Sequence, residues 1–127
     1  MSNKVHGRTK AREGAIKSLY QMRYLNDVDK CLTNDKLANN YVEGVIKHQG
    51  EIDALITPNL KKGWRIEQLN PVDLSILRLA IYELKYEDTP PAVVVNEALE
   101  LAKKFSSTEA KNFIHHTLDV VSKEINE

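Results

Sequence analysis

The segment NPVDLSILRLAIYELK, residues 70–85, is the most hydrophobic part of the chain. Asn70 is suited to cap a helix, Pro71 suits the first helical position, and Asp73 places negative charge in the first turn. At about 100° per residue the apolar side chains that follow cover most of the helix circumference. We therefore predict a central helix surrounded by others. Its polar stripe is predicted to consist of Ser75, Arg78, Tyr82 and Lys85.

Helical periodicity also fills the chain before this segment. Apolar residues spaced three and four apart predict a helix over 7–24. A polar run at 26–29 interrupts the pattern, and a second helix is expected to begin near Thr33 or Asn34 and to end at Gly50. The N-terminal part therefore reads as helices joined by short polar breaks.

Residues 59–70 are predicted to form a connector containing at most one helical turn. A short helical segment before this connector stops ahead of Pro58, because the residue before a proline is disfavoured in a helix. Within the connector, Trp64 is expected to seal the loop beneath the lysine and arginine side chains around it.

Two further helices are predicted after the central one. The prolines at 90 and 91 start a helix through Phe105, since the strongly helix-forming continuation outweighs the three preceding valines. Ser106 followed by Glu109 has the spacing of a capping box, which predicts the start of the last helix. The fold class is therefore all-α, a compact bundle of about six or seven helices.

Composition fits one small globular domain. The 127 residues include a single cysteine, Cys31, which excludes a disulfide framework and fits a reducing cytoplasm. No apolar run reaches the roughly 18 residues that a membrane span needs, so no membrane association is expected.

The balanced total charge, 18 basic against 18 acidic residues, hides an asymmetry. Residues 1–24 carry six basic side chains and one acidic one, whereas the remainder carries 12 basic and 17 acidic ones. This division suggests a polyanionic partner for the N-terminus and a basic partner elsewhere, although a solubilising tail explains the charge equally well.

The sequence contains no recognisable catalytic constellation. There is no phosphate-binding glycine loop, nucleophile elbow or pair of histidines at helical spacing. His115 and His116 are adjacent and diverge by about 100° on a helix, so they cannot hold one metal together. We expect no enzymatic activity, no metal and no cofactor.

Arg8 and Arg12 are the first candidates for nucleic-acid contacts. They lie one turn apart at the end of the apolar stripe, where two guanidinium groups could hold phosphates or simply solvate a helix end. Phe105 and Phe113 flank the loop into the last helix, and each could stack on a base or belong to the core.

Four segments, in this order, resemble the NusB family of bacterial transcription antitermination proteins. They correspond to a basic first helix, a central helix, a block around the Val-Asn-Glu-Ala sequence and a final helix. Two departures are visible: His115-His116 stand where the family usually has Asn-Gly, and Thr9 occupies a position that is often basic. The four segments are residues 8–20, 72–84, 88–105 and 113–119.

The resemblance implies two helical subdomains and a non-catalytic role. Family members bind boxA-type single-stranded RNA together with NusE, a small-subunit ribosomal protein, and join RNA polymerase with NusA and NusG to support ribosomal RNA transcription. Carried over by position, the RNA-binding residues are Arg8, Lys10, Arg12, Lys104 and Phe113. The residues expected to face NusE are Glu67, Asp73, Phe105 and Glu109.

The expected organisation is a single NusB-like RNA-binding domain over 1–127. It comprises a flexible basic arm (1–6), N-terminal helices (7–58) and C-terminal helices (70–126). Two alternatives stay open: a helical adaptor that binds proteins only, and a relative of the RNA-binding domain of RNA cytosine methyltransferases. In those enzymes the helical domain is fused to a catalytic domain, for which we expect no room in a chain that ends at Glu127. Some family members dimerise, so the resemblance leaves open whether this protein is a monomer or a homodimer.

Overall fold

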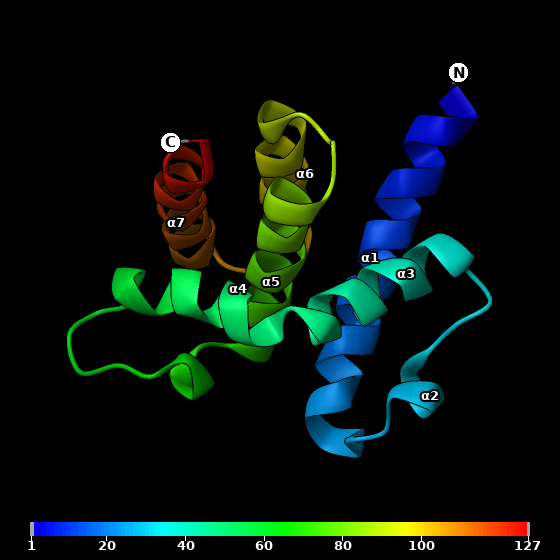
Figure 1. The fold of residues 1–127 in the computed structure, drawn as a ribbon, viewed down its shortest axis with the longest axis horizontal. Coiled ribbons are helices and arrows are strands. Elements are labelled where there is room, and N and C mark those ends of the chain that lie inside the picture. The colour runs from blue at the N-terminus through cyan, green and yellow to red at the C-terminus, as the bar shows by residue number, and fades with distance from the viewer. Residues whose placement is uncertain (1, 127) are drawn as a thin grey trace.

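The computed structural model describes residues 2–126, with side chains described from Gly7 onward, and these residues form helices and connecting loops (Figure 1). The predicted all-α class is therefore confirmed for the described part of the chain. The elements are α1 (Ser2–Leu25), α2 (Val28–Cys31), α3 (Lys36–Lys47), α4 (Gln49–Ile56), the 3-10 helices η1 (Thr57–Asn59) and η2 (Ile66–Gln68), α5 (Pro71–Tyr86), α6 (Pro91–Phe105) and α7 (Thr108–Asn126).

Helix α5 lies at the centre of the bundle, as its sequence predicts. It packs against α1, α3, α4, α6 and α7. Its start is capped as expected, because the Asn70 side chain accepts a hydrogen bond from the Val72 backbone N–H at 2.9 Å. One part of the prediction is wrong: Ser75 is buried rather than part of an exposed polar stripe, and its hydroxyl donates to the Pro71 carbonyl at 2.8 Å.

The N-terminal helices differ from their predicted bounds. Helix α3 begins later than expected, because the Asp35 carboxylate accepts hydrogen bonds from the Leu37 and Ala38 N–H groups at 3.0 and 3.2 Å. The polar run at 26–29 is predicted only to interrupt the helices, but its second half begins the short helix α2. Gly50 lies within α4 instead of ending the preceding helix.

The elements before α5 form the N-terminal half of the molecule. Helices α5, α6 and α7 pack side by side and form the C-terminal half (Figure 1). The predicted helix over 91–105 is confirmed, valines included. The predicted capping box is wrong by one residue. Ser107, not Ser106, caps α7 by accepting from the Ala110 N–H at 3.1 Å, and Ser106 instead donates to the Asp73 carboxylate.

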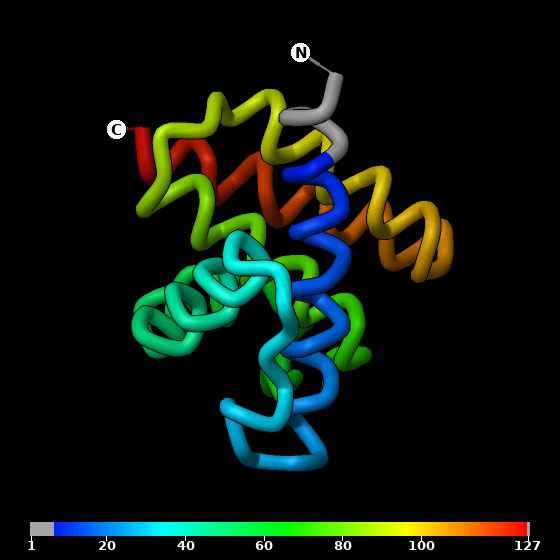
Figure 2. The backbone as a smooth tube through the Cα atoms, turned by 90° about the vertical axis from the view of Figure 1, so that its right-hand side faces the viewer, coloured from blue at the N-terminus to red at the C-terminus, as the bar shows by residue number. Residues whose placement is uncertain are grey.

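Both halves share one hydrophobic core. Buried residues of α1, α3, α4, α5, α6 and α7 form a single cluster. In Figure 2, α1 runs down the middle of the view with α3 to its left, and α1 packs on both α3 and α5. The backbone of α1 begins at Ser2, but the predicted flexible arm (1–6) concerns side chains outside the described part, so it stays a prediction.

The connector between α4 and α5 contains the two 3-10 turns. Its tryptophan contradicts the prediction of a sealed loop, because Trp64 is 45% exposed. The Lys61 ammonium lies over the Trp64 ring, 5.9 Å from its centre. The indole is therefore displayed at the surface.

Candidate nucleic-acid interface

The basic residues of α1 have different surroundings. Arg8 and Lys10 are exposed, whereas Arg12, one turn after Arg8, is only 3% exposed. One nitrogen of Arg8, Nη1, donates to the hydroxyl of Tyr41 on α3 at 3.0 Å. The rest of that guanidinium has room for an outside acceptor, so Arg8 and Lys10 keep the surface position that phosphate contacts require.

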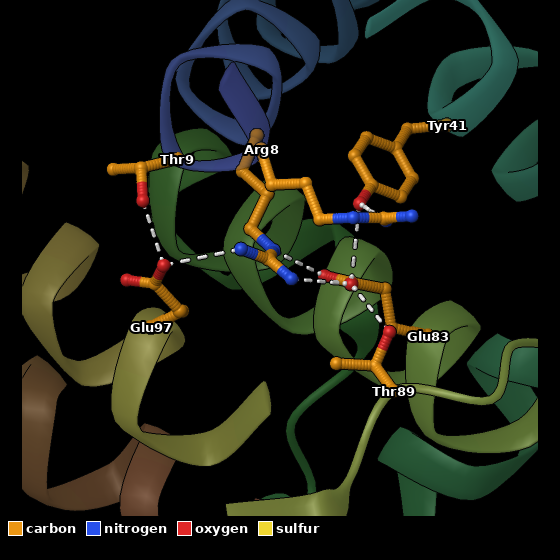
Figure 3. Close-up of polar contacts among 7 residues, drawn as sticks. Arg8, Thr9, Tyr41, Glu83, Thr89 and Glu97 are labelled. Atoms are coloured by element: carbon orange, nitrogen blue, oxygen red, sulfur yellow. Dashed lines mark hydrogen bonds and ion pairs between the residues drawn. The ribbon is translucent and has the colours of Figure 1, made fainter. Parts of the chain in front are cut away.

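The expectation that Arg12 contacts RNA directly is corrected by its burial. Its Nε and Nη2 donate to the two carboxylate oxygens of Glu83 at 2.8 and 2.9 Å, and Nη1 donates to Glu97 at 3.1 Å (Figure 3). Burial opposes the charged form, but the hydrogen bonds and negative charge of Glu83 prevail, and the pKa of Arg12 is raised. Arg12 is therefore an internal ion-pair residue that joins α1 to α5 and α6.

Three hydroxyl groups complete this network. Thr9 donates to Glu97 at 2.7 Å, while the Tyr41 and Thr89 hydroxyls reach the same oxygen of Glu83 at 3.4 and 3.5 Å (Figure 3). Burial first, and the charge of Glu83 second, raise the pKa of Tyr41. The phenol thus stays a neutral donor, and through its bond from Arg8 it links the exposed arginine to the buried network.

A groove of about 590 Å³ opens beside this network. Arginine side chains of α1 form one wall, and the loop from α5 into α6 forms the other, so cationic and anionic groups face the same space. Its lining residues are Arg8, Arg12, Tyr86, Glu87, Asp88, Thr89, Pro90, Val93 and Glu97.

A second, apolar hollow of about 250 Å³ lies further along α1, where it meets the start of α5 and the end of α6. Phe105, 38% exposed, forms part of its wall. Lys104 sits next to it: its ammonium is 2.9 Å from the Glu13 carboxylate and 5.4 Å from the Phe105 ring centre. The hollow is lined by Ile16, Lys17, Tyr20, Gln21, Val72 and Phe105.

The residues expected to face a protein partner lie around the start of α5 and of α7. Asp73 accepts a hydrogen bond from Ser106, which places it beside the end of α6. Glu109 is exposed in the first turn of α7. Glu67 is exposed in η2, where its carbonyl accepts from Arg23 of α1 at 3.2 Å.

Phe113 is half-buried against the core, so of the two roles that the sequence left open for it, packing accounts for at least part of this side chain. His115 lies 3.7 Å from Asp119, the pairing that its helical spacing predicts. Among the described residues, no group of three or more histidine, cysteine or carboxylate side chains is placed to hold a metal ion. None of the helices described is both long and apolar enough to cross a membrane.

Sequence reasoning missed the partners of Arg12. Glu83 follows Leu79 by four residues and Ile76 by seven, so helical spacing places it on the apolar face of α5. A carboxylate at such a position requires a cation nearby, because burying an unpaired charge costs too much free energy. That signal was present; the identity of the partner on α1 required the fold. Tyr20, which lines the hollow beside Phe105, was also not singled out as a site residue.

These features define a small helical binding protein, in which exposed cations and an apolar hollow lie along α1 and carboxylates lie on the elements around it. The NusB family model matches residues 9–123, and the chain therefore belongs to the NusB family.

Its relatives carry the name transcription antitermination protein NusB. The protein from Listeria innocua is 42% identical over 126 residues, covering 92% of this chain and 97% of that protein. The Macrococcus caseolyticus protein is 42% identical over 126 residues, with 91% and 96% covered. These names describe transcription factors rather than enzymes.

Solved structures show the same fold. Thermotoga maritima NusB superimposes with a TM-score of 0.81 at 32% identity and covers 92% of this chain and 91% of its own. A chain from a crystal structure of the antitermination factors NusB and NusE in complex with dsRNA superimposes with a TM-score of 0.79 at 25% identity, covering 94% and 98%.

Proposed function

We propose that this protein is a non-catalytic transcription antitermination factor that binds boxA-type single-stranded leader RNA together with NusE. In the cytoplasm the pair would join RNA polymerase with NusA and NusG and support ribosomal RNA transcription. Family membership supports this proposal, as does the structural similarity to a chain from a complex of NusB, NusE and dsRNA.

The observation that carries the proposal is the meeting of candidate RNA and partner residues at the junction of α1, α5 and α6. Lys104 reaches across to Glu13 on α1, and the neighbouring Phe105 lines the apolar hollow against Tyr20. Asp73 adjoins the same corner through Ser106. A ribonucleotide base in the hollow would therefore lie between the basic side chains of α1 and the acidic start of α5.

On the RNA side, Arg8 and Lys10 are the proposed phosphate contacts, because both are exposed. Lys104 and Phe113 are proposed to extend this surface from α6 and α7. Arg12 becomes a positioning residue: it anchors Glu83, which accepts from Tyr41, and Tyr41 in turn receives the bond from Arg8.

On the partner side, the carboxylates suit a basic ribosomal protein. Residues 25–127 carry 12 basic and 17 acidic side chains, and opposite charge steers association and fixes orientation. The proposed NusE contacts are Glu67, Asp73, Phe105 and Glu109.

RNA binding is tested with the double variant Arg8→Ala, Lys10→Ala. For single strands the logarithm of affinity falls by about 0.7 per logarithm of salt for each phosphate contact, so the variant should bind more weakly and its slope should be about 1.4 shallower. Fluorescence anisotropy of labelled boxA RNA over a salt series measures both quantities. Lys30→Ala, an exposed lysine on α2, is the matched control.

An unchanged affinity and slope in the double variant would contradict the assigned RNA surface. Absence of any RNA binding by the intact protein, with NusE binding retained, would instead support the alternative of a helical adaptor that binds only proteins.

Partner binding is tested by reversing one charge. Asp73→Lys should weaken NusE binding strongly because like charges then face each other, whereas Asp73→Asn keeps the hydrogen-bond acceptor for Ser106 and should weaken it less. Calorimetry gives the affinity, and the melting temperature checks folding. Asp29→Lys on α2 is the control, and equal NusE affinity in all four proteins would exclude Asp73 from the interface.

A further inference from the structure

The loop Lys61-Lys62-Gly63-Trp64-Arg65 is a surface feature that the proposed function does not use. It contains three basic side chains and the only tryptophan of the chain within five positions, with no acidic residue among them. It belongs to the portion of the chain in which acidic residues outnumber basic ones, 17 to 12. The loop is therefore a positive site on an otherwise acidic body.

The backbone of this loop has a defined conformation. The Trp64 N–H donates to the Lys61 carbonyl at 2.9 Å, which closes a four-residue turn. Gly63 has a φ of +86°, the value that a type II turn requires at its third position and that glycine adopts without strain. The turn thus presents Trp64 and the lysines in a fixed relation to each other.

Both ends of the loop are anchored to the body. Leu60 on one side, and Ile66 and Leu69 on the other, pack against the hydrophobic core. The Arg65 N–H also donates to the side chain of Gln68 at 2.7 Å. Binding at an anchored loop loses less conformational entropy than binding at a mobile one.

The side chains of the loop are available to a ligand. Trp64 is 45% exposed, and Lys61 stands over one side of its ring. Among the ion pairs formed by the described residues, none involves the three cations of this loop. An aromatic face and unpaired cations side by side are what single-stranded nucleic acid requires: the base stacks and the phosphates are neutralised.

We propose that the loop Lys61–Arg65 is a second contact for single-stranded RNA, in which Trp64 stacks on a base while Lys62 and Arg65 hold the adjoining phosphates. An acidic protein segment would use the cations equally well but would leave the indole face unused, so the observations favour RNA. The inference rests on the proposed function, because it supposes that RNA is the ligand of this protein.

The position of the loop indicates which nucleotides it would contact. It lies at the end of the molecule away from the N-terminus of α1 (Figure 1). Arg23, near the C-terminal end of α1, bonds to Glu67 just beyond the loop and ties it to that end of the helix. The proposed second contact is with nucleotides that flank the boxA element held by Arg8 and Lys10, so the contribution of the loop should depend on RNA length.

The intrinsic fluorescence of the protein reports directly on this loop, because Trp64 is the sole tryptophan. We expect saturable quenching when boxA RNA extended by flanking nucleotides is added to the full chain, and little change with the boxA element alone. Anisotropy of the labelled RNA in the same samples measures binding independently. A polyglutamate peptide, added in place of RNA, tests the alternative ligand, an acidic protein segment.

The outcomes separate the two proposals. If the anisotropy changes with neither the boxA element nor the extended RNA, the protein does not bind RNA and the proposed function itself is overturned. Binding of extended RNA without any change in Trp64 emission, or quenching by polyglutamate but not by RNA, would overturn only the second contact.

Variants provide the second readout. Trp64→Ala should weaken binding of the extended RNA by between about fivefold and 150-fold, as for one stacked base, and leave the short RNA unaffected. Lys62→Ala with Arg65→Ala should make the salt slope for extended RNA about 1.4 shallower. The matched control, Lys30→Ala with Lys36→Ala, removes two exposed lysines elsewhere and should change neither. Equal loss with short and extended RNA would contradict the assignment to flanking nucleotides.

Discussion

Replacing Arg12 with alanine should destabilise the protein severely. The Arg12 and Glu83 side chains are 4% and 2% exposed, and two parallel hydrogen bonds of 2.8 and 2.9 Å join them. Truncating Arg12 leaves the Glu83 carboxylate buried without its cation, which typically costs about 3–5 kcal/mol. Small domains are stable by only about 5–15 kcal/mol, so this single change removes a large part of the free energy of unfolding.

Urea denaturation at neutral pH measures this loss. Lys104→Ala is the matched control: its pair with Glu13 has side chains 59% and 23% exposed, and an exposed pair contributes at most about 1 kcal/mol. The second variant is Arg12→Met with Glu83→Leu, which removes both charges and should recover most of the stability. A loss below about 1 kcal/mol in Arg12→Ala, or no recovery in the double variant, would refute the assignment of Arg12 as a buried ion-pair residue.

Three further outcomes are expected. A Cβ at Gly44 would overlap the ring of Tyr82, so Gly44→Ala should lower the free energy of unfolding by about 1–3 kcal/mol, and equal stability in urea would contradict this close approach. The Thr117 hydroxyl is buried without a hydrogen-bond partner, so Thr117→Val should leave the melting temperature unchanged or raise it. Hydrogen bonds from Tyr86 and from the lysine beside it lower the pKa of Glu51, so its contribution to stability should be present at neutral pH and lost on acidification through that lowered pKa. The stabilities of Glu51→Gln and of the intact protein should therefore differ at pH 7, and this difference should shrink as the pH is lowered; a constant difference would contradict the linkage.

The central helix was predictable because its apolar residues exceed what a surface helix carries. The two helices after it were predictable from the prolines and the helix-forming residues of the first and from the capping-type residues before the second. Residues 70–85 have a cap, a first-turn proline and an almost continuous apolar circumference, and α5 indeed packs against α1, α3, α4, α6 and α7. Errors gathered at the ends of helices, where one polar side chain decides at which residue the helix begins. Asp35 starts α3 and Ser107 starts α7, each next to another residue of the capping type that the sequence offered equally well.

The site was less predictable than the fold. Counting charges on α1 identified a basic helix, but the burial of each cation depends on which element covers it. Tyr41, Glu83 and Glu97 come from α3, α5 and α6, separated from Arg12 by 29, 71 and 85 positions. Local spacing carries no information about contacts at such separations. It only signals that Glu83, on an apolar face, requires a partner somewhere.

Arg8 is exposed and Arg12 is buried, and this difference changes the salt dependence expected for RNA binding. By sequence, the first helix offers Arg8, Lys10 and Arg12 to phosphates, which corresponds to a salt slope of about 2.1 for single-stranded RNA. The positive charge of Arg12 is already neutralised by Glu83 and Glu97 within the protein. Turning the Arg12 side chain outward to RNA would leave the buried carboxylate of Glu83 without its cation. Two contacts then remain on this helix, and its share of the slope should be about 1.4. Arg12 contributes to RNA binding in another way: by holding Glu83, it keeps Tyr41 and hence Arg8 in place. Its loss should therefore lower affinity, and the slope should fall by at most the roughly 0.7 that belongs to Arg8, with no further contribution from Arg12 itself.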